Sequence, residues 1–233
     1  MPAQAWRRWL LSLVLGYACA GGAAVLAVAM TRRWVDHGLQ AWDERVLLAL
    51  ADSSFSVPQG LWFEAWGSSA FLVPMLLIAV VLLIRAGHLF RALTLLVAYL
   101  LNKGLVLGAW QLWDRARPEL VAEGIAAPGL HSFPSGHAVN AVVLFGLIGA
   151  MWWRASRSVV ERALIVPVVG AVVLLTCVGR VRLGTHWPSD IVAGLAIGSI
   201  WLAGLIVAVA LAERSGSAPR SDGVIGGGRE PVA

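Results

Sequence analysis

The stretch GRVRLGTHWPSD, from Gly179 to Asp190, runs directly into the apolar segment IVAGLAIGSIWLAGLIVAVAL, from Ile191 to Leu211. The apolar segment is long enough to cross a bilayer, because a hydrocarbon core of about 30 Å needs roughly 20 apolar residues in a helix. Proline suits the first turn of a helix, so Pro188 predicts a membrane-spanning helix that begins just after His186. The polar stretch therefore belongs at a membrane surface.

The rest of the chain has the same character, since 59% of its 233 residues are hydrophobic and only 13% are charged. Backbone polar groups must be satisfied internally in lipid, so the apolar runs are expected to be helices. We predict an all-α bundle of six transmembrane helices, with one domain over residues 1–214. The predicted spans are Trp9 to Met30, Gly67 to Ile84, Phe90 to Trp110, Ala138 to Trp153, Ala163 to Gly179 and Ile191 to Leu211.

Three segments lie outside this pattern. Between the first two spans, Thr31 to Glu64 is polar but has apolar residues at helical spacing, which predicts a short interfacial helical segment. The N-terminal run after Arg8 also resembles a secretory signal, but it is longer than a typical one, so we expect an uncleaved span. Residues 215–233 are rich in glycine and lack an apolar period, which predicts a disordered cytoplasmic tail.

The cationic residues indicate orientation rather than a soluble binding face. The net charge is +5, but the basic residues are scattered between apolar spans, so no nucleic-acid partner is expected. With a cytoplasmic N-terminus, ten arginines fall in inside segments and seven in outside segments. One lysine among many arginines, with abundant alanine, glycine and valine, suggests a bacterial origin. We therefore expect a multi-pass protein of a bacterial inner (plasma) membrane.

Three polar clusters stand at the ends of apolar spans, around Arg117, around Ser135 and between Arg180 and Asp190. With six spans, all three fall on one face of the membrane, which the charge distribution identifies as the periplasmic or exterior face. Cys19 and Cys177 lie inside apolar runs, where thiols behave as small hydrophobes, so neither a disulfide nor a metal site is expected.

The last cluster has the chemistry of nucleophilic catalysis. His186 and Asp190 are four residues apart, so the carboxylate can accept the proton of one imidazole nitrogen and leave the other free to attack. Alternatively, His186 caps a helix and Asp190 complements its dipole. Guanidinium groups match phosphate oxygens and are costly near lipid without an anion, so Arg180 and Arg182 favour a phosphate site.

The middle cluster has features of an anion site. Ser135-Gly136-His137 opens a helix, where free backbone N–H groups bind anions, and the Ser135 hydroxyl adds a donor or serves as an N-cap. His137 can then protonate a leaving oxygen. Arg117 ends the third span at the depth of lipid phosphates, where it either contacts substrate or extends to headgroups.

Together these residues resemble the type 2 phosphatidic acid phosphatase (PAP2) superfamily, whose motifs are K-x6-R-P, P-S-G-H and S-R-x5-H-x3-D. The second motif is matched in full by residues 134–137. The third is matched by Arg180, His186 and Asp190, with Gly179 where the family often has serine. The resemblance covers nearly the whole chain apart from the tail.

The first motif is incomplete. Arg117-Pro118 is present, but Trp110 stands where the family has lysine. Lys103 is seven residues further back, about 10 Å deeper by helical rise, and would need a local rearrangement to take over. Arg115 or Arg182 are the other candidates for this auxiliary charge.

The resemblance implies a phosphohistidine enzyme without metal or other cofactor. His186 would attack phosphorus with Asp190 orienting it, His137 would protonate the leaving oxygen, and Arg117, Arg180, Ser135 and the Gly136 amide would hold the phosphoryl oxygens. The expected substrate is a phosphate or diphosphate monoester of a lipid: undecaprenyl diphosphate, phosphatidylglycerophosphate or phosphatidic acid. The expected roles are in lipid metabolism and cell wall biogenesis.

Two alternatives remain open at this point. One is a phosphotransferase that passes the phosphoryl group from one lipid to an acceptor other than water. The other is a degenerate member that binds lipid phosphate without turnover, as Trp110 suggests. Vanadium haloperoxidases share the histidine and arginine pattern but are typically soluble, and a channel would carry more ionisable residues inside its spans. The sequence makes no prediction about oligomeric state.

Overall fold

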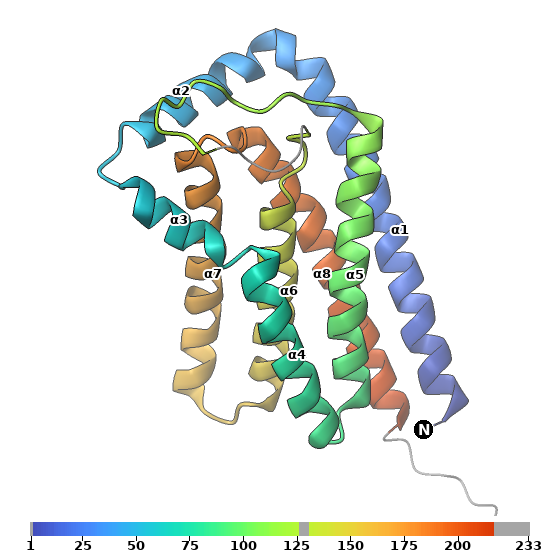
Figure 1. The fold of residues 1–233 in the computed structure, drawn as a ribbon. Coiled ribbons are helices and arrows are strands. Elements are labelled where there is room, and N and C mark those ends of the chain that lie inside the picture. Colours follow the sequence, from blue (N-terminus) through green and yellow to red (C-terminus); the bar gives the residue numbers. More distant parts are fainter. Residues whose placement is uncertain (1, 126–130, 217–233) are drawn as a thin grey trace, which may run out of the picture.

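The computed structural model describes residues 2–125 and 131–216, and the regular secondary structure of these ranges is entirely helical (Figure 1). The elements are α1 (Ala3–Trp34), η1 (Val35–Leu39), α2 (Gln40–Ala51), α3 (Val57–Ala65), α4 (Ser69–Arg85), α5 (Leu89–Leu112), α6 (Gly136–Ala155), α7 (Val159–Arg182) and α8 (Pro188–Gly216). Six helical segments are long and apolar enough to cross a membrane, which confirms the predicted fold class.

The observed helices differ from the predicted spans mainly at their ends. Five of them extend beyond the predicted limits on both sides, whereas α4 begins at Ser69 rather than at Gly67. α8 continues to Gly216, so the first two residues of the predicted tail are helical, and Ser215 accepts a hydrogen bond from Arg8. The rest of that predicted tail lies outside the described residues.

Serine side chains define where several helices begin. Ser56, Ser68, Ser135 and Ser158 are the N-caps of α3, α4, α6 and α7, and each accepts a hydrogen bond from a backbone N–H three residues later. Such caps satisfy donors that the first turn of a helix leaves unpaired. They therefore fix the points at which the chain enters these four helices.

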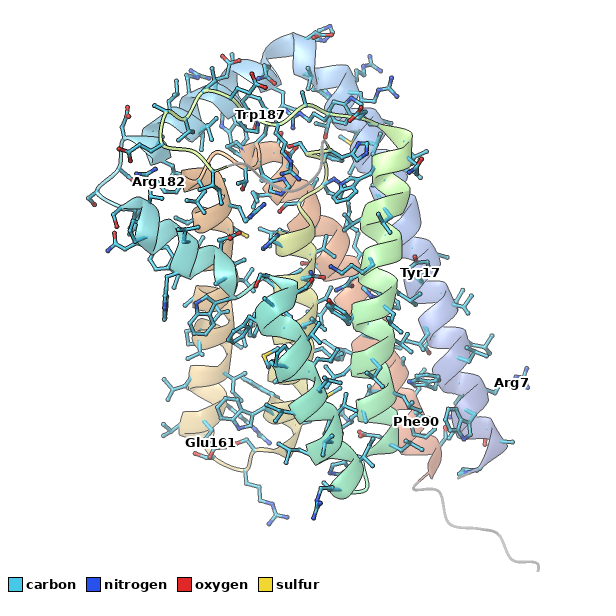
Figure 2. All side chains as sticks on the ribbon, viewed as in Figure 1. Arg7, Tyr17, Phe90, Glu161, Arg182 and Trp187 are labelled. Carbon is cyan, nitrogen blue, oxygen red and sulfur yellow. The ribbon has the colours of Figure 1, made fainter. Side chains whose placement is uncertain are left out.

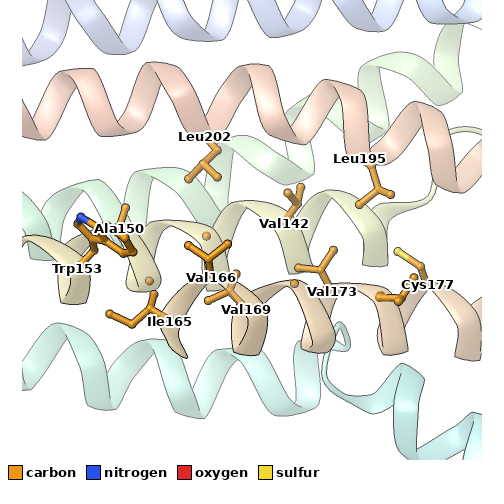
Figure 3. Close-up of a pocket in the computed structure, with 14 residues that line it drawn as sticks. Val142, Ala150, Trp153, Ile165, Val166, Val169, Val173, Cys177, Leu195 and Leu202 are labelled. Atoms are coloured by element: carbon orange, nitrogen blue, oxygen red, sulfur yellow. The ribbon is translucent and has the colours of Figure 1, made fainter. Parts of the chain in front are cut away.

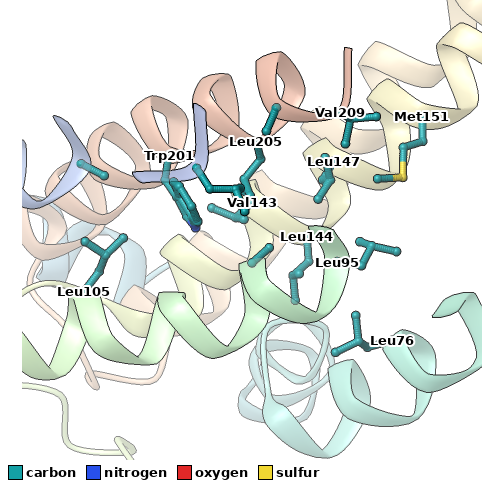
Figure 4. Close-up of a cluster of buried hydrophobic side chains, with 14 of the residues drawn as sticks. Leu76, Leu95, Leu105, Val143, Leu144, Leu147, Met151, Trp201, Leu205 and Val209 are labelled. Atoms are coloured by element: carbon teal, nitrogen blue, oxygen red, sulfur yellow. The ribbon is translucent and has the colours of Figure 1, made fainter. Parts of the chain in front are cut away.

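The first and last spans pack closely along each other. A Cβ atom added to Gly16 of α1 would lie 2.8 Å from the Cα atom of Gly204 of α8, so these backbones touch. Next to this contact, Trp201 is fully buried and meets Tyr17 with ring centroids 5.4 Å apart. Trp201 belongs to the main apolar core, to which α1, α4, α5, α6 and α8 all contribute (Figure 4).

The interfacial segment lies across one end of the bundle. The chain bends in η1, where Gly38 has a φ of 100°, and continues into α2 and α3, which lie at the end where α5 stops and α8 begins (Figure 1). The predicted interfacial helices are therefore present. α2 turns Asp43 and Leu47 into the protein, whereas Trp42 remains 39% exposed. Its buried side therefore combines an acid with a leucine, while Trp42 lies on its exposed side.

The start of α4 opens a space inside the bundle. α3 descends along α7, so α4 begins well below the upper ends of α5 and α7 (Figure 1). The upper part of α5 therefore lacks the neighbour that α4 provides lower down. This arrangement leaves room beside α5 for polar side chains, which would pack against α4 if that helix extended as far up as α5.

A second space, of about 480 Å³, lies on the other side of α6, between α6, α7 and α8 (Figure 3). Its lining is apolar and contains neither charged side chains nor histidine. It includes Val142 of α6, Val166, Val169 and Val173 of α7, and Leu195 and Leu202 of α8. This cavity therefore offers no charged or imidazole group to a ligand.

Candidate active site

The three polar clusters meet at one end of the bundle. Figure 2 shows Arg182 and Trp187 at the end opposite Arg7 and Glu161. The C-terminal ends of α5 and α7 and the N-terminal ends of α6 and α8 lie there together (Figure 1). The prediction that the clusters share one face is therefore confirmed.

At this end lies a cavity of about 310 Å³. Of the predicted catalytic and phosphate-binding residues, His137, His186, Arg117, Arg180 and Gly136 line it, whereas Asp190 and Ser135 are fully buried behind them. The remaining lining residues are Gly67, Ser69, Asn102, Lys103, Val106, Leu107, Trp110 and Asn140.

The imidazole of His186 is held in one tautomer. Its Nδ1 atom lies 2.8 Å from the backbone carbonyl oxygen of Ser132. A carbonyl can only accept, so Nδ1 carries the proton and Nε2 carries the lone pair, which can accept from the neighbouring Arg117. Nε2 lies 3.4 Å from Nη1 of Arg117, which lines the same cavity. The unprotonated nitrogen of His186 therefore lies at the cavity beside a cation.

Asp190 supports His186 but is not its nearest acceptor. Its Oδ2 lies 3.6 Å from His186 Nδ1, farther than the Ser132 carbonyl. The same Oδ2 accepts hydrogen bonds from the Ser132 hydroxyl and, at 2.9 Å, from the Trp187 amide. The carboxylate thus adds negative charge beside the imidazole and fixes the loop that positions it.

The surroundings keep His186 neutral. Complete burial lowers the pKa of His186 to about 4, although the neighbouring Asp190 carboxylate acts in the opposite direction. Desolvation disfavours the charged imidazolium, and the nearby cations Arg180 and Arg117 disfavour it further. The ring is therefore unprotonated near pH 7, as nucleophilic attack requires.

Two guanidinium groups approach the cavity from different elements. Arg117, after the end of α5, donates to the Thr185 carbonyl, and burial together with Arg180 lowers its pKa. Arg180, in the last turn of α7, is 4% exposed and forms an ion pair with Glu64. Its Nε atom is buried and has no hydrogen-bond partner among the described residues. A guanidinium remains charged under these conditions, so both groups can hold an anion.

Glu64, at the end of α3, was not predicted as a site residue. Its Oε2 lies 3.4 Å from Nε2 of His137 and also pairs with Arg180. Close packing of α3 on α7 makes this possible, because a Cβ atom on Gly179 would lie 2.7 Å from the Glu64 amide nitrogen. Glycine at the position where the family often has serine thus allows an acid to reach the site.

The start of α6 has the predicted local geometry. The Ser135 side chain caps the helix by accepting from the Ala138 amide at 3.5 Å, and it does not line the cavity. Gly136 does line it, next to His137. The backbone N–H groups of the first turn form an anion-binding helix terminus. Ser135 therefore acts as the N-cap, and Gly136 presents the backbone.

Arg115 and Arg182 do not replace the missing motif lysine. Arg115 donates to Asp43 at 2.7 Å and to Asp190 at 2.5 Å, so it belongs to a buried network behind the site. Arg182 donates to the Phe55 carbonyl at 2.6 Å. Neither residue lines the cavity.

Lys103 lines the cavity, seven residues deeper along α5 than Trp110. Because α4 begins low, the cavity extends down α5 to this residue. There Nζ of Lys103 donates to the hydroxyl of Ser69 at 3.1 Å. Lys103 thus lines the cavity at its own depth, and Trp110 lines it at the position of the motif lysine.

Asp43 is the second acid that sequence reasoning missed. It is fully buried and accepts from the amide of Ser189 at 2.8 Å and from the hydroxyl of Ser189 at 2.6 Å. It joins α2 to the loop that carries His186. The available signal was an acid inside an otherwise amphipathic segment, which does not by itself indicate what the acid contacts.

Comparison with known proteins agrees with this geometry. Residues 91–214, more than half of the chain, match the PAP2 superfamily, and the chain belongs to that superfamily. It is 31% identical over 146 residues to phosphatidylglycerophosphatase B of Bacillus subtilis (strain 168), a match that covers 57% of this chain and 64% of that relative. The chain thus matches slightly less than two thirds of the relative's length.

Two solved structures share the fold. The transmembrane PAP2-type phosphatidylglycerolphosphate phosphatase of Bacillus subtilis superposes with a TM-score of 0.60 at 21% identity, covering 91% of this chain and 98% of that one. LpxE of Aquifex aeolicus superposes with a TM-score of 0.53 at 19% identity, covering 71% and 93%. At these identities the likenesses show the fold, and the activity must be argued from the site.

Proposed function

We propose that this membrane protein is a lipid phosphatase that hydrolyses a phosphate or diphosphate monoester through a phosphohistidine formed on His186. The observation that carries the proposal is that four side chains line one cavity: a neutral His186 with its lone pair on Nε2, Arg117, Arg180 and His137. This set supplies a nucleophile, two cations for a phosphoryl group and a proton donor.

In the first step, Nε2 of His186 attacks phosphorus, and the bond to the lipid oxygen breaks. Arg117, Arg180 and the first-turn amides of α6 stabilise the equatorial oxygens, which is the main requirement of phosphoryl transfer. The Ser132 carbonyl and the Asp190 carboxylate stabilise the positive charge that develops on the imidazole. His137 donates a proton to the leaving lipid oxygen.

In the second step, water attacks the phosphohistidine and releases inorganic phosphate and neutral His186. His137, deprotonated in the first step, accepts a proton from this water. The Oε2 atom of Glu64 lies 3.4 Å from Nε2 of His137, within reach of that ring's proton. The cycle uses only groups of this chain.

The proposed orientation places the site at the outer face of a bacterial inner membrane. Arg7, Arg8, Arg85, Arg154 and Arg162 lie on helix ends and loops at the opposite end of the bundle. Clusters of arginine in short loops favour the cytoplasmic side. Single cysteines placed at Asp52 and at Gly87, in a background without Cys19 and Cys177, should react with an impermeant maleimide only at position 52 in intact spheroplasts. Reaction at position 87 instead would reverse the orientation.

The activity is tested with the detergent-purified chain and a panel of phosphatidic acid, phosphatidylglycerophosphate and an isoprenyl diphosphate. Wild type should release inorganic phosphate with and without chelator, and His186→Asn should release none while remaining folded. Brief reaction with a ³²P-labelled substrate should leave an acid-labile, base-stable label on the wild-type protein. Retained turnover in His186→Asn would refute the assignment, and label on an added acceptor instead of free phosphate would identify a phosphotransferase.

A further inference from the structure

The lower half of the active-site cavity carries polar groups that the proposed reaction does not use. These are Lys103, Ser69, Asn102 and Asn140, which line the same space as His186. Their placement at membrane depth requires an explanation, because a lysine inside a transmembrane helix is costly unless it faces water or a partner. Lys103 forms no ion pair with any acid among the described residues.

The helix geometry places this group on the membrane side of the reacting phosphoryl group. On α6, Asn140 follows His137 by three residues, about 4.5 Å further from the helix start and from the membrane surface. On α5, Lys103, Val106, Leu107 and Trp110 have the spacing of one helix face, and all four line the cavity. A lipid whose leaving oxygen lies at His137 must continue past these side chains toward the bilayer interior.

The side chains of this lower half are already positioned. Lys103 Nζ donates to Ser69 Oγ at 3.1 Å and lies 5.4 Å from the centre of the Tyr99 ring. An ammonium group has three donors, so the contact with Ser69 leaves others for a ligand. Asn102 is fully buried and donates to Asn140 at 3.2 Å, while its own Oδ1 has no partner within the described residues. The floor of the cavity is thus polar, and not all of its hydrogen-bonding groups have partners among the described residues.

The charges indicate which ligand suits this floor. One phosphate monoester carries close to two negative charges near pH 7. At the His186 end, Arg117 and Arg180 are the two cations, and Arg180 is paired with Glu64. Lys103 adds a further positive charge on the lipid side. The leaving group of phosphatidic acid is an uncharged diacylglycerol, which offers no anion to Lys103. A substrate with a second phosphoryl group does.

We propose that Lys103 and Ser69 form a second anion subsite, which binds a phosphoryl group on the lipid side of the scissile bond. This inference rests on the proposed function. The shared chemistry is an anionic phosphoryl oxygen next to the leaving group, which either the proximal phosphoryl of a lipid diphosphate or the phosphodiester of phosphatidylglycerophosphate supplies. The subsite selects these substrates over lipids with a single phosphate.

The test compares substrates that share a lipid chain. One pair is farnesyl diphosphate and farnesyl monophosphate, and the other is phosphatidylglycerophosphate and phosphatidic acid with the same acyl chains. In Lys103→Met, kcat/KM should fall about ten- to hundredfold for the substrate with two phosphoryl groups, the usual effect of losing a charge-assisted hydrogen bond. It should stay nearly unchanged for the partner with one. Ser69→Ala should give a smaller loss of the same selectivity.

The two substrate pairs distinguish the sources of the second phosphoryl group. Only the pair whose second phosphoryl group binds at the subsite should change its ratio of kcat/KM values in Lys103→Met. An equal loss on both members of each pair would overturn the subsite, since it would indicate that Lys103 acts on fold stability or on the reacting phosphoryl group. Unchanged values for every substrate would overturn it as well. The thermal midpoint of the variant in detergent, measured in parallel, shows whether the protein remains folded.

A binding measurement separates this proposal from the activity itself. If wild type hydrolyses none of the four lipids, the proposed function fails, and calorimetry with inorganic phosphate and with methylenebisphosphonate decides on the subsite. Lys103→Met should weaken bisphosphonate binding while leaving phosphate binding unchanged. Equal weakening of both ligands, or no change in either, would overturn the subsite.

Discussion

Nη1 of Arg115 lies 2.5 Å from Oδ1 of Asp190, and both side chains are at least 95% buried. The same guanidinium pairs with the fully buried Asp43 of α2. An arginine that the sequence suggested as an auxiliary charge for the phosphate site is therefore the cation that two buried acids share. It links α2 to Asp190, whose carboxylate lies beside His186.

Replacing Arg115 should destabilise the protein rather than weaken substrate binding alone. Arg115→Gln leaves two buried carboxylates without their cation, and removing one partner of a buried pair typically costs about 3–5 kcal/mol. Thermal unfolding in detergent should show a large fall in midpoint. The control is Arg154→Gln, whose partner Glu213 lies 3.4 Å away in a pair with the arginine 41% exposed, and which should change stability little. A normal midpoint for Arg115→Gln would contradict the structural role.

The role of His137 predicts a dependence on the leaving group. His137→Gln should lower kcat about a hundredfold to ten-thousandfold for lipid substrates, whose alkoxide leaving groups need protonation. An aryl phosphate with an acidic phenol needs no proton donor, so its turnover should be affected much less. Measuring both substrates with one preparation gives the comparison. Equal losses on both would assign His137 to phosphate binding instead.

The Glu64 carboxylate pairs with Arg180 and therefore competes with a bound phosphate for that guanidinium. The variant Glu64→Gln removes the carboxylate that pairs with Arg180, so inorganic phosphate should inhibit at least about fivefold more strongly. This magnitude follows because one unit charge at 4 Å contributes about 1 kcal/mol even in bulk water. At the same time kcat for lipid substrates should fall, because His137 loses the carboxylate that lies 3.4 Å from its Nε2.

Gly179→Ser tests the same contact from the neighbouring helix. A side chain at this position would meet the Glu64 amide nitrogen, so α3 must move and the Glu64 carboxylate with it. The variant should therefore show the same stronger phosphate inhibition as Glu64→Gln. Weaker inhibition by phosphate in both variants would show that Glu64 supports anion binding rather than opposing it.

The low pKa of His186, about 4, can be observed directly. Because burial lowers this pKa below the ordinary value, the ring should remain neutral as the pH falls through 6.5 and should protonate only near pH 4. ¹⁵N NMR of histidine-labelled protein in detergent, with the signal assigned by His186→Asn, should show a neutral ring with its proton on Nδ1 at pH 5.5. A His186 signal that titrates near 6.5 would contradict the burial argument.

Much of the fold and half of the site could be predicted because the signals are local. Each transmembrane helix is one continuous apolar run, and the order of the spans alone brings Arg117, Ser135 and His186 to the same end. Proline at 188 and serine at 135 mark helix starts by their backbone chemistry, and the structure has both helices beginning there.

The remaining parts of the site depend on contacts between elements far apart in the chain. Glu64 reaches Arg180 only because α3 descends along α7 at Gly179, and no periodicity in α3 indicates that path. The position of Lys103 depends on where α4 begins, since an ordinary full-length neighbour would have closed the cavity above it. Helix depth relative to a neighbour is a tertiary property, so spacing along α5 could not predict it.

The descent of α3 and the late start of α4 have a consequence for how relatives of this chain are compared. The family match begins at residue 91, yet Asp43, Glu64 and Ser69 all come from before it. Two proteins that agree at every motif residue can therefore differ in the acid that competes with phosphate and in the partner given to Lys103. Divergence of substrate preference within the superfamily should be sought in these N-terminal elements rather than in the shared catalytic residues.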